Sequence, residues 1–220
     1  MSNYDLTKII NLNNLVTNII YYEKITSTND IAKEILKKVN SQMNNFLVLS
    51  NCQTNGRGKG DAYYFSPAEV GIYMSLVLIK PTYDLRLISI VTSLAISNTL
   101  STFVDAGVKI KWPNDILINN KKVCGILIES ATQPQNLTLD YVIVGIGINI
   151  NNEKFCSNLE STATSLKKEC GQVIDRNIVI IKILNSLNFL LTKSPKKLFN
   201  EYLMKLDKKS LNRISQFGIF

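Results

Sequence analysis

Short apolar runs recur along the chain, and each is typical of a strand that is buried on at least one face. They predict seven strands, at 18–25, 46–52, 71–79, 108–112, 116–118, 122–129 and 137–150. Pro81 and Pro113 end two of these runs, because proline lacks the N–H that a sheet needs. Asn119 and Asn120 lie between the fifth and sixth runs and predict a hairpin turn, since asparagine tolerates a positive φ.

Four other segments predict helices. Ser27–Val39 begins with residues that commonly cap a helix, and Leu85–Phe103 places its apolar residues on one helical face. The last third of the chain adds apolar or amphipathic helices at 174–191 and 196–206, and little is expected to fold after Lys208. Together these elements predict an α+β fold, in which a mixed sheet carries helices packed on one side.

Composition limits the kinds of protein that this chain can be. Its 220 residues, 45% of them hydrophobic, suit one globular domain with a substantial core. Histidine is absent, which excludes Ser-His-Asp and Cys-His nucleophiles and every histidine-containing metal site. The four cysteines form no CxxC pair and are expected to be reduced thiols in the cytoplasm. No membrane span and no secretory signal are expected.

The net charge of +8 favours polyanionic partners such as nucleic acid, nucleotide phosphates or an acidic protein surface. Much of the excess comes from lysines at 33–38, 167–168 and 196–209. A solvated helix face explains these lysines as well as a binding patch does.

A glycine-rich loop, Gly56-Arg57-Gly58-Lys59-Gly60, follows the second predicted strand. Its glycines allow backbone N–H groups to face an anion, while Arg57 and Lys59 add positive charge. The loop therefore suits a phosphate or a carboxylate, although it lacks P-loop spacing. A flexible basic surface turn is the alternative interpretation.

Polar residues and glycines also gather at the ends of predicted strands. Trp112 offers a wide face to a ligand, whereas Asn114 and Asp115 suit either a ligand or an ordinary turn. Glycines inside the last two strands permit close approach of a ligand, and a lysine and an asparagine flank them; these residues are Lys122, Gly125, Gly145, Gly147 and Asn149.

Ser27, Thr28 and Asn29 have two interpretations. Capping of the first helix alone would justify these residue types. A functional role would require a ligand at the same helix N-terminus, where hydroxyl and N–H groups converge.

The order and spacing of these segments carry more information than any one of them. The series runs Ser-Thr-Asn-Asp at 27–30, Gln53-x-x-Gly-Arg-Gly-Lys, Phe-Ser-Pro at 65–67, Lys-Trp-Pro-Asn-Asp at 111–115, Lys-x-x-Gly-Ile-Leu-x-Glu at 122–129 and Gly-x-Gly-x-Asn-x-Asn at 145–151. This series resembles the biotin protein ligases, also called biotin–[acetyl-CoA-carboxylase] ligases. The resemblance covers about residues 22–151.

The resemblance implies the class II synthetase-like catalytic domain of biotin and lipoate ligases. It implies that biotin and MgATP react to give biotinyl-5′-AMP and pyrophosphate, and that biotin then passes to one lysine of a biotin carboxyl carrier domain. The implied cofactor is Mg²⁺ brought by ATP, without a metal site made by protein ligands alone. A homodimer is possible in this family.

The resemblance also implies roles for individual residues. The implied biotin contacts are Ser27, Thr28, Asn29, Gln53, Gly56, Arg57, Gly58, Lys59, Tyr73, Trp112, Lys122 and Gly125. The implied nucleotide contacts are Arg57, Gly58, Lys59, Asn114, Lys122 and Asn149. Arg57 and Lys122 would act on the transferring phosphoryl group, where positive charge lowers the barrier. Asp115 is the candidate base for the carrier lysine, because no histidine can serve.

This sequence departs from the family pattern in three places. Lys59, Asp61 and Ala62 replace an arginine, a glycine and an arginine in the glycine-rich loop, and lysine lacks the bidentate fork. We therefore expect looser retention of the adenylate. Too few residues precede the matched region for a DNA-binding domain, so no repressor function is expected. We expect a catalytic domain at 1–210 and a remnant at 211–220, with the SH3-like domain absent or truncated.

Two alternatives come from other interpretations of the same residues. One is a lipoate–protein ligase of the same superfamily, although its Arg-Arg-x-x-Gly-Gly-Gly type of motif is absent. The other is a non-catalytic nucleotide- or nucleic-acid-binding protein, which the positive charge suggests.

Overall fold

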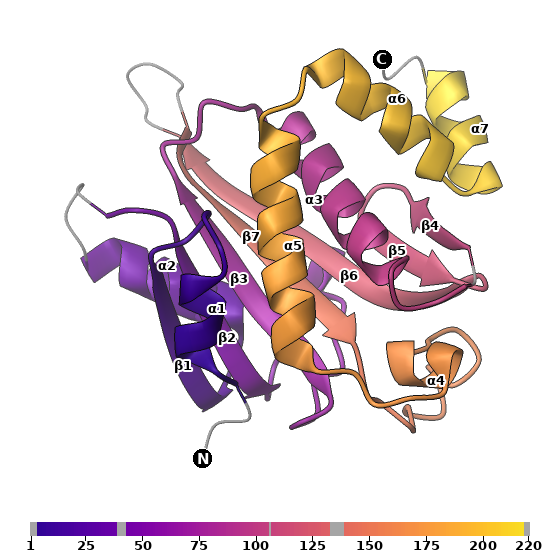
Figure 1. Cartoon of the computed structure of the whole chain (residues 1–220), viewed down its shortest axis with the longest axis horizontal. Coiled ribbons are helices and arrows are strands. Elements are labelled where there is room, and N and C mark those ends of the chain that lie inside the picture. Colours follow the sequence, from indigo (N-terminus) through magenta and orange to yellow (C-terminus); the bar gives the residue numbers. More distant parts are fainter. Residues whose placement is uncertain (1–3, 39–42, 106, 133–138, 218–220) are drawn as a thin grey trace.

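The computed structural model describes residues 4–38, 43–105, 107–132 and 139–217. Its centre is a seven-stranded sheet in the order β1-β2-β3-β7-β6-β5-β4 (Figure 1). The strands are β1 (Asn18–Ile25), β2 (Phe46–Gln53), β3 (Gly71–Ile79), β4 (Val108–Lys111), β5 (Asp115–Ile118), β6 (Lys121–Thr132) and β7 (Leu139–Asn149). Only β1 and β2 pair in parallel within the described part of the chain, so the expected mixed sheet is confirmed.

Helices account for most of the remaining described residues. They are α1 (Leu6–Asn11), α2 (Thr28–Lys38), α3 (Leu85–Leu100), α4 (Leu166–Cys170), α5 (Arg176–Leu191), α6 (Pro195–Lys205) and α7 (Lys208–Phe217), with a short 3-10 turn, η1, at Lys59–Asp61. Carboxylate caps begin the two longest helices: Asp84 accepts from the Leu87 N–H, and Asp175 accepts from the Asn177 N–H. No described helix is long and apolar enough to cross a membrane.

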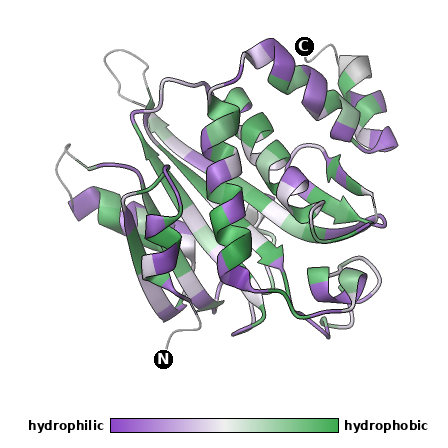
Figure 2. Ribbon diagram, in the orientation of Figure 1, coloured by the Kyte–Doolittle hydropathy of each residue, from purple (hydrophilic) through white to green (hydrophobic). Residues whose placement is uncertain are grey.

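Both faces of the sheet bury apolar side chains. On one face, Leu47 and Leu49 of β2 join the main core beneath α3 and α5, which lie side by side in Figure 1. On the other face, Phe46 and Val48 pack with Ala32 of α2. This two-sided burial explains the continuous apolar runs in the central strands. Figure 2 shows these strands coloured mainly as hydrophobic.

The division of the helices between the faces positions the site. The expected helix layer forms on the main-core face, whereas α2 alone among the longer described helices covers the opposite face. Because α2 packs against β2, β3 and β7, its N-terminus lies over the middle of the sheet. The remaining area of that face, over β6 and β7, is available to the glycine-rich loop.

Three helices were not predicted. The expectation that little folds after Lys208 is wrong, because α7 continues to Phe217 and buries Ser210 and Ile214. The helices α1 and α4 are too short to show a clear apolar repeat. The predicted hairpin does form, since Asn119 and Asn120 have φ values of 50° and 62°. The expected division at residue 210 falls inside α7 and remains a prediction.

Candidate functional site

A cavity of about 220 Å³ lies on the α2 face of the sheet, between α2, the glycine-rich loop and strands β6 and β7. Its floor contains Gly125 and Gly147, which are directly paired across β6 and β7. A Cβ at Gly147 would lie 2.4 Å from Cε1 of Tyr64, and one at Gly145 would lie 2.4 Å from Oδ1 of Asn29. Glycine is therefore required at both positions for side chains from the loop and from α2 to rest on the strands.

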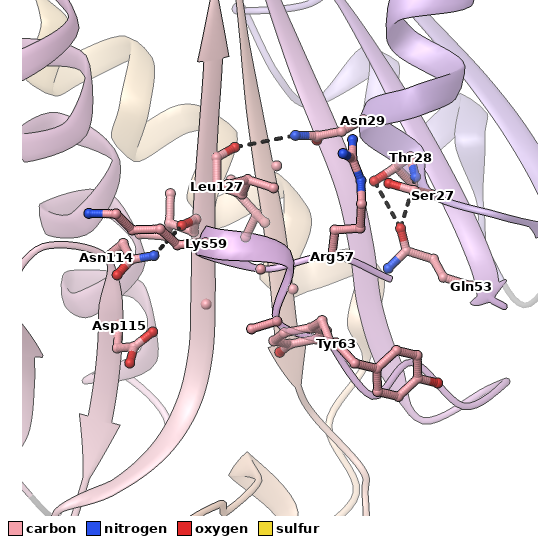
Figure 3. Close-up of a pocket in the computed structure, with 18 of the residues that line it drawn as sticks. Ser27, Thr28, Asn29, Gln53, Arg57, Lys59, Tyr63, Asn114, Asp115 and Leu127 are labelled. Atoms are coloured by element: carbon pink, nitrogen blue, oxygen red, sulfur yellow. Dashed lines mark hydrogen bonds between the residues drawn. The ribbon is translucent and has the colours of Figure 1, made fainter. Parts of the chain in front are cut away.

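The first wall is a network of neutral polar groups at the start of α2 (Figure 3). The Thr28 N–H donates to Oε1 of Gln53 over 2.8 Å, and Nε2 of Gln53 donates to the Ser66 hydroxyl over 2.9 Å. The Ser75 hydroxyl donates to Oδ1 of Asn29 over 2.5 Å and lies 2.7 Å from the Thr28 hydroxyl. All of these side chains are buried, so the network fixes the orientation of the polar groups that face the cavity.

The glycine-rich loop forms the roof. The Gly58 N–H donates to the Ala62 carbonyl and the Tyr64 N–H donates to the Gly56 carbonyl, which folds the segment back on itself. Gly60 has a φ of 64°, a left-handed conformation that glycine adopts without strain. The Arg57 guanidinium forms an ion pair with Asp30 of α2, whereas the Lys59 side chain is exposed.

The second wall is charged. Nζ of Lys122 lies 2.6 Å from Oδ1 of Asp115, and Nζ of Lys111 lies 3.8 Å from the other oxygen of the same carboxylate. Nδ2 of Asn114 donates to the Ile126 carbonyl over 3.0 Å, so the turn before β5 is tied to β6. One cavity thus presents neutral hydrogen-bonding groups on one side and a lysine–carboxylate pair on the other.

Burial changes the proton affinity of several groups near this cavity. Burial raises the pKa of the Tyr64 hydroxyl well above its usual value, and neighbouring groups, among them Cys124 and Asp115, raise it further. Burial also raises the pKa of the Cys124 thiol, so Cys124 is not a thiolate nucleophile at neutral pH. Burial alone would raise the pKa of Glu129, but hydrogen bonds from Lys33 and Asn29 outweigh it and lower that pKa.

Most of the residues named from the sequence do line the cavity. They are Ser27, Thr28, Asn29, Gln53, Arg57, Gly58, Lys59, Asn114, Asp115, Lys122 and Gly125. Gly56 lies just behind them, where a Cβ would meet the Tyr64 carbonyl at 2.5 Å. Its contribution is to let the loop close tightly rather than to touch a ligand.

Three residues with expected ligand contacts are not among the residues that line the cavity, and their expected contacts stay predictions. The Tyr73 ring is fully buried over Gly71, and its hydroxyl donates to the Pro67 carbonyl. Trp112 packs against the main core, and its backbone N–H donates to the Ser210 hydroxyl. Nδ2 of Asn149 donates to the Thr164 carbonyl, so this side chain supports the loop after β7.

Eight further residues line the cavity, and of these the sequence indicated only Gly145 and Gly147, as glycines that permit close approach of a ligand. The eight residues are Ala62, Tyr63, Tyr64, Ile126, Leu127, Gly145, Ile146 and Gly147. The adjacent aromatic residues that follow a glycine-rich loop were a usable signal for Tyr63 and Tyr64, because aromatic rings commonly cover a bound ligand. Among the described residues, no group of three or more acidic, cysteine or histidine side chains could hold a metal ion.

The comparisons with known proteins point to one family. The sequence profile of the biotin/lipoate A/B protein ligase family matches residues 21–149. The bifunctional ligase/repressor BirA of Bacillus spizizenii is 37% identical over 171 residues, which are 76% of this chain and 51% of that protein. The chain thus spans about half the length of the curated relative that it matches.

Solved structures agree with this match. The biotin protein ligase from Aquifex aeolicus in complex with biotin and ATP superposes with a TM-score of 0.73 at 29% identity, covering 86% of this chain and 78% of that one. The Leishmania major biotin protein ligase in complex with biotinyl-5-AMP gives a TM-score of 0.72 at 25% identity, covering 87% and 82%. Because the matched profile covers more than half of the residues, including the whole cavity floor and roof, the chain belongs to the biotin/lipoate A/B protein ligase family.

Proposed function

We propose that this chain is an ATP-dependent biotin–protein ligase. It would join biotin to AMP and then pass the biotinyl group to a lysine of a biotin carboxyl carrier domain. The observation that carries the proposal is the two-sided cavity, in which buried neutral donors and acceptors face a lysine–carboxylate pair. The similar structures with bound biotin, ATP or biotinyl-5-AMP support this substrate class.

The neutral wall suits the head group of biotin. A ureido ring offers two N–H donors and one carbonyl acceptor, and it has to be bound without a charge. Thr28, Asn29 and Gln53 provide amide and hydroxyl groups that the network holds in fixed orientations. Buried polar groups of this kind select strongly, because a ligand that does not match leaves them unpaired.

The charged wall suits the end of biotin that reacts, its carboxylate, together with the phosphates of ATP. A biotin carboxylate oxygen attacks the α-phosphorus of ATP, the bond from that phosphorus to the bridging oxygen breaks, and pyrophosphate leaves. Two anions must approach each other, so Lys122 and Lys59 would offset their charges. Magnesium would enter as the MgATP substrate and supply further charge neutralisation.

The second step needs a free amine. The carrier lysine attacks the acyl carbon of the adenylate, the bond from that carbon to the phosphate oxygen breaks, and AMP leaves. The nitrogen loses a proton, and Asp115 is the carboxylate among the described lining residues that would accept it. If Asp115 has this role, an Asp115→Asn variant transfers biotin more slowly than it forms the adenylate. Equal slowing of both steps would assign Asp115 to positioning Lys122 instead.

The free cysteine thiols support a proposal about the cellular compartment. We propose that the chain works in a reducing cytoplasm, where its free cysteines persist and ATP is abundant.

The first test is ATP–pyrophosphate exchange, measured in parallel with biotin and with lipoate. Exchange should require biotin. The exchange rate of a Lys122→Gln variant should be lower than that of the wild type by at least about a hundredfold, since one preorganised charge contributes about that factor to the rate. Lys121→Gln is the matched control, because Lys121 precedes Lys122 in β6 and is exposed. Exchange with lipoate alone, or with neither acid, would contradict the proposal.

A further inference from the structure

Two carboxylates and two cations meet beside the neutral wall of the cavity. Arg57 of the loop forms an ion pair with Oδ1 of Asp30 in the first turn of α2, and its Nη2 lies 3.6 Å from Oε2 of Glu129 in β6. Nζ of Lys33 in α2 lies 2.6 Å from Oε1 of Glu129. These four residues, here called the loop clasp, join three elements that are distant in the sequence.

The loop clasp is partly shielded from solvent. Its side chains are between 25% and 34% exposed, so their attraction is screened less than that of a fully exposed pair. Nδ2 of Asn29 donates to Oε2 of Glu129 over 2.7 Å, which links the clasp to the neutral wall. The lowered pKa of Glu129 agrees with a carboxylate that is held in its charged form.

The loop clasp limits how far Arg57 is available to bind a phosphate. Its Nη2 is bound to Asp30, and Nε is buried without a hydrogen-bond partner among the described residues. Two carboxylates therefore balance the charge of Arg57 within the protein. Lys59, which takes part in none of the ion pairs between described residues, is the cation of the loop that remains available to a phosphate.

We propose that Asp30 is a positioning residue, which with Glu129 holds Arg57 and so keeps the glycine-rich loop closed over the cavity. The strength of the loop clasp then sets how long a reactive acyl-adenylate is retained. The identity of the retained molecule rests on the proposed function, but the closure of the loop does not.

Limited trypsin digestion of the full chain, without any ligand, tests the closure directly. Cleavage after Arg57 and Lys59 should be roughly three- to tenfold faster in an Asp30→Asn variant, the range expected for losing one partly buried charge-assisted hydrogen bond. Glu34→Gln is the matched control, because Glu34 is an exposed acid on the same helix. Asp30→Glu keeps the charge and should restore much of the protection.

The second measurement is the release of biotinyl-AMP from the enzyme in a chase experiment. Asp30→Asn should accelerate release by a similar factor, while the unfolding midpoint stays close to that of Glu34→Gln. High salt should accelerate release from the wild type toward the rate of the Asp30→Asn variant and should affect the variant less.

The possible outcomes separate the clasp from the proposed function. Wild-type rates of loop cleavage and release in Asp30→Asn, with normal biotin-dependent exchange, would overturn the clasp and leave the ligase function intact. Faster cleavage in Asp30→Asn, together with no exchange in the wild type, would support the clasp and overturn the ligase function.

Discussion

Gly147 lies so close to the Tyr64 ring that no side chain fits between them. An alanine methyl group at Gly147 would force the ring and the roof of the cavity outward. Inserting a methyl group into a tightly packed place costs about 1–3 kcal/mol, and here the cost falls on the ligand-binding conformation. The cavity therefore requires glycine at position 147 more than the strand β7 itself does.

We expect Gly147→Ala to weaken biotin binding by about 1–3 kcal/mol, roughly 5- to 150-fold in the dissociation constant, measured by titration calorimetry. Gly107→Ala is the control, because a Cβ at Gly107 meets nothing within 4 Å. Unchanged affinity in Gly147→Ala would show that the Tyr64 ring does not have to remain over β7 for binding.

Glu129 gives a pH dependence whose sign follows from its pKa. The folded protein lowers this pKa, so Glu129 contributes stability at a pH above its unfolded-state value of about 4.3. That contribution is lost as the pH falls through the lowered folded-state value.

The free energy of unfolding of the wild type should therefore exceed that of Glu129→Gln at pH 7, and the difference should shrink below about pH 4.3. Urea unfolding of both proteins between neutral and acidic pH measures this difference. A gap that stays constant over the whole range would exclude a role for the ionised carboxylate.

At the scale of elements, α7 supports the turn that carries Asn114 and Asp115. The Ser210 hydroxyl accepts the Trp112 N–H over 2.8 Å, and the Asp207 N–H donates to the Ile110 carbonyl over 2.9 Å. The start of α7 thus holds the end of β4, immediately before the charged wall.

Removing the Ser210 hydroxyl leaves the Trp112 N–H without this partner. We expect Ser210→Ala to lower the free energy of unfolding by about 1–3 kcal/mol and to weaken ATP binding more than biotin binding. Lys209→Ala, a change at an exposed position of the same helix, should do neither. Equal losses for both ligands would show a general loss of stability instead of a local one.

The elements differ in how well the sequence predicts them. The strands β2 and β3 match their apolar runs because both faces of the central sheet are buried. The helix α7 was missed because Lys208–Phe217 is mostly polar, and burial of Ser210 and Ile214 depends on β4 and its surroundings. Leu211, Ile214 and Phe217 recur at helical spacing, but a segment so rich in polar residues is held as a helix mainly by tertiary contacts.

Prediction of the candidate site from the sequence is limited in the same way, because contacts between distant segments form only in the folded protein. The ordered motifs identified the neutral wall, the loop and Lys122, but an aromatic residue type does not reveal where its ring points. The rings of Tyr73 and Trp112 lie outside the cavity lining, and their expected biotin contacts stay predictions. The partnership of Asp30, Arg57 and Glu129 was also hidden, because three elements distant in sequence form it only after folding.

For the whole molecule, the net charge of +8 matters most for association with another protein. Lysines of α6 and α7, such as Lys196, Lys197, Lys205 and Lys209, add to the positive charge near the C-terminal end of the described chain. Charge complementarity of this kind mainly affects the rate at which partners meet.

If the acceptor is an acidic carrier domain, biotin transfer should slow by roughly tenfold or more between low and high salt, through kcat/KM. ATP–pyrophosphate exchange should change much less, because it involves no second protein. A salt response of equal size in both assays would assign the effect to the active site.

The cavity also draws on two separate parts of the chain. The residues of the neutral wall all precede residue 76, whereas Asn114, Asp115 and Lys122 follow residue 110. A molecule that spans the cavity therefore contacts both the first and the second part of the chain at once. Its binding free energy adds to the stability of the folded state, so unfolding should move to a higher temperature when the ligand is bound.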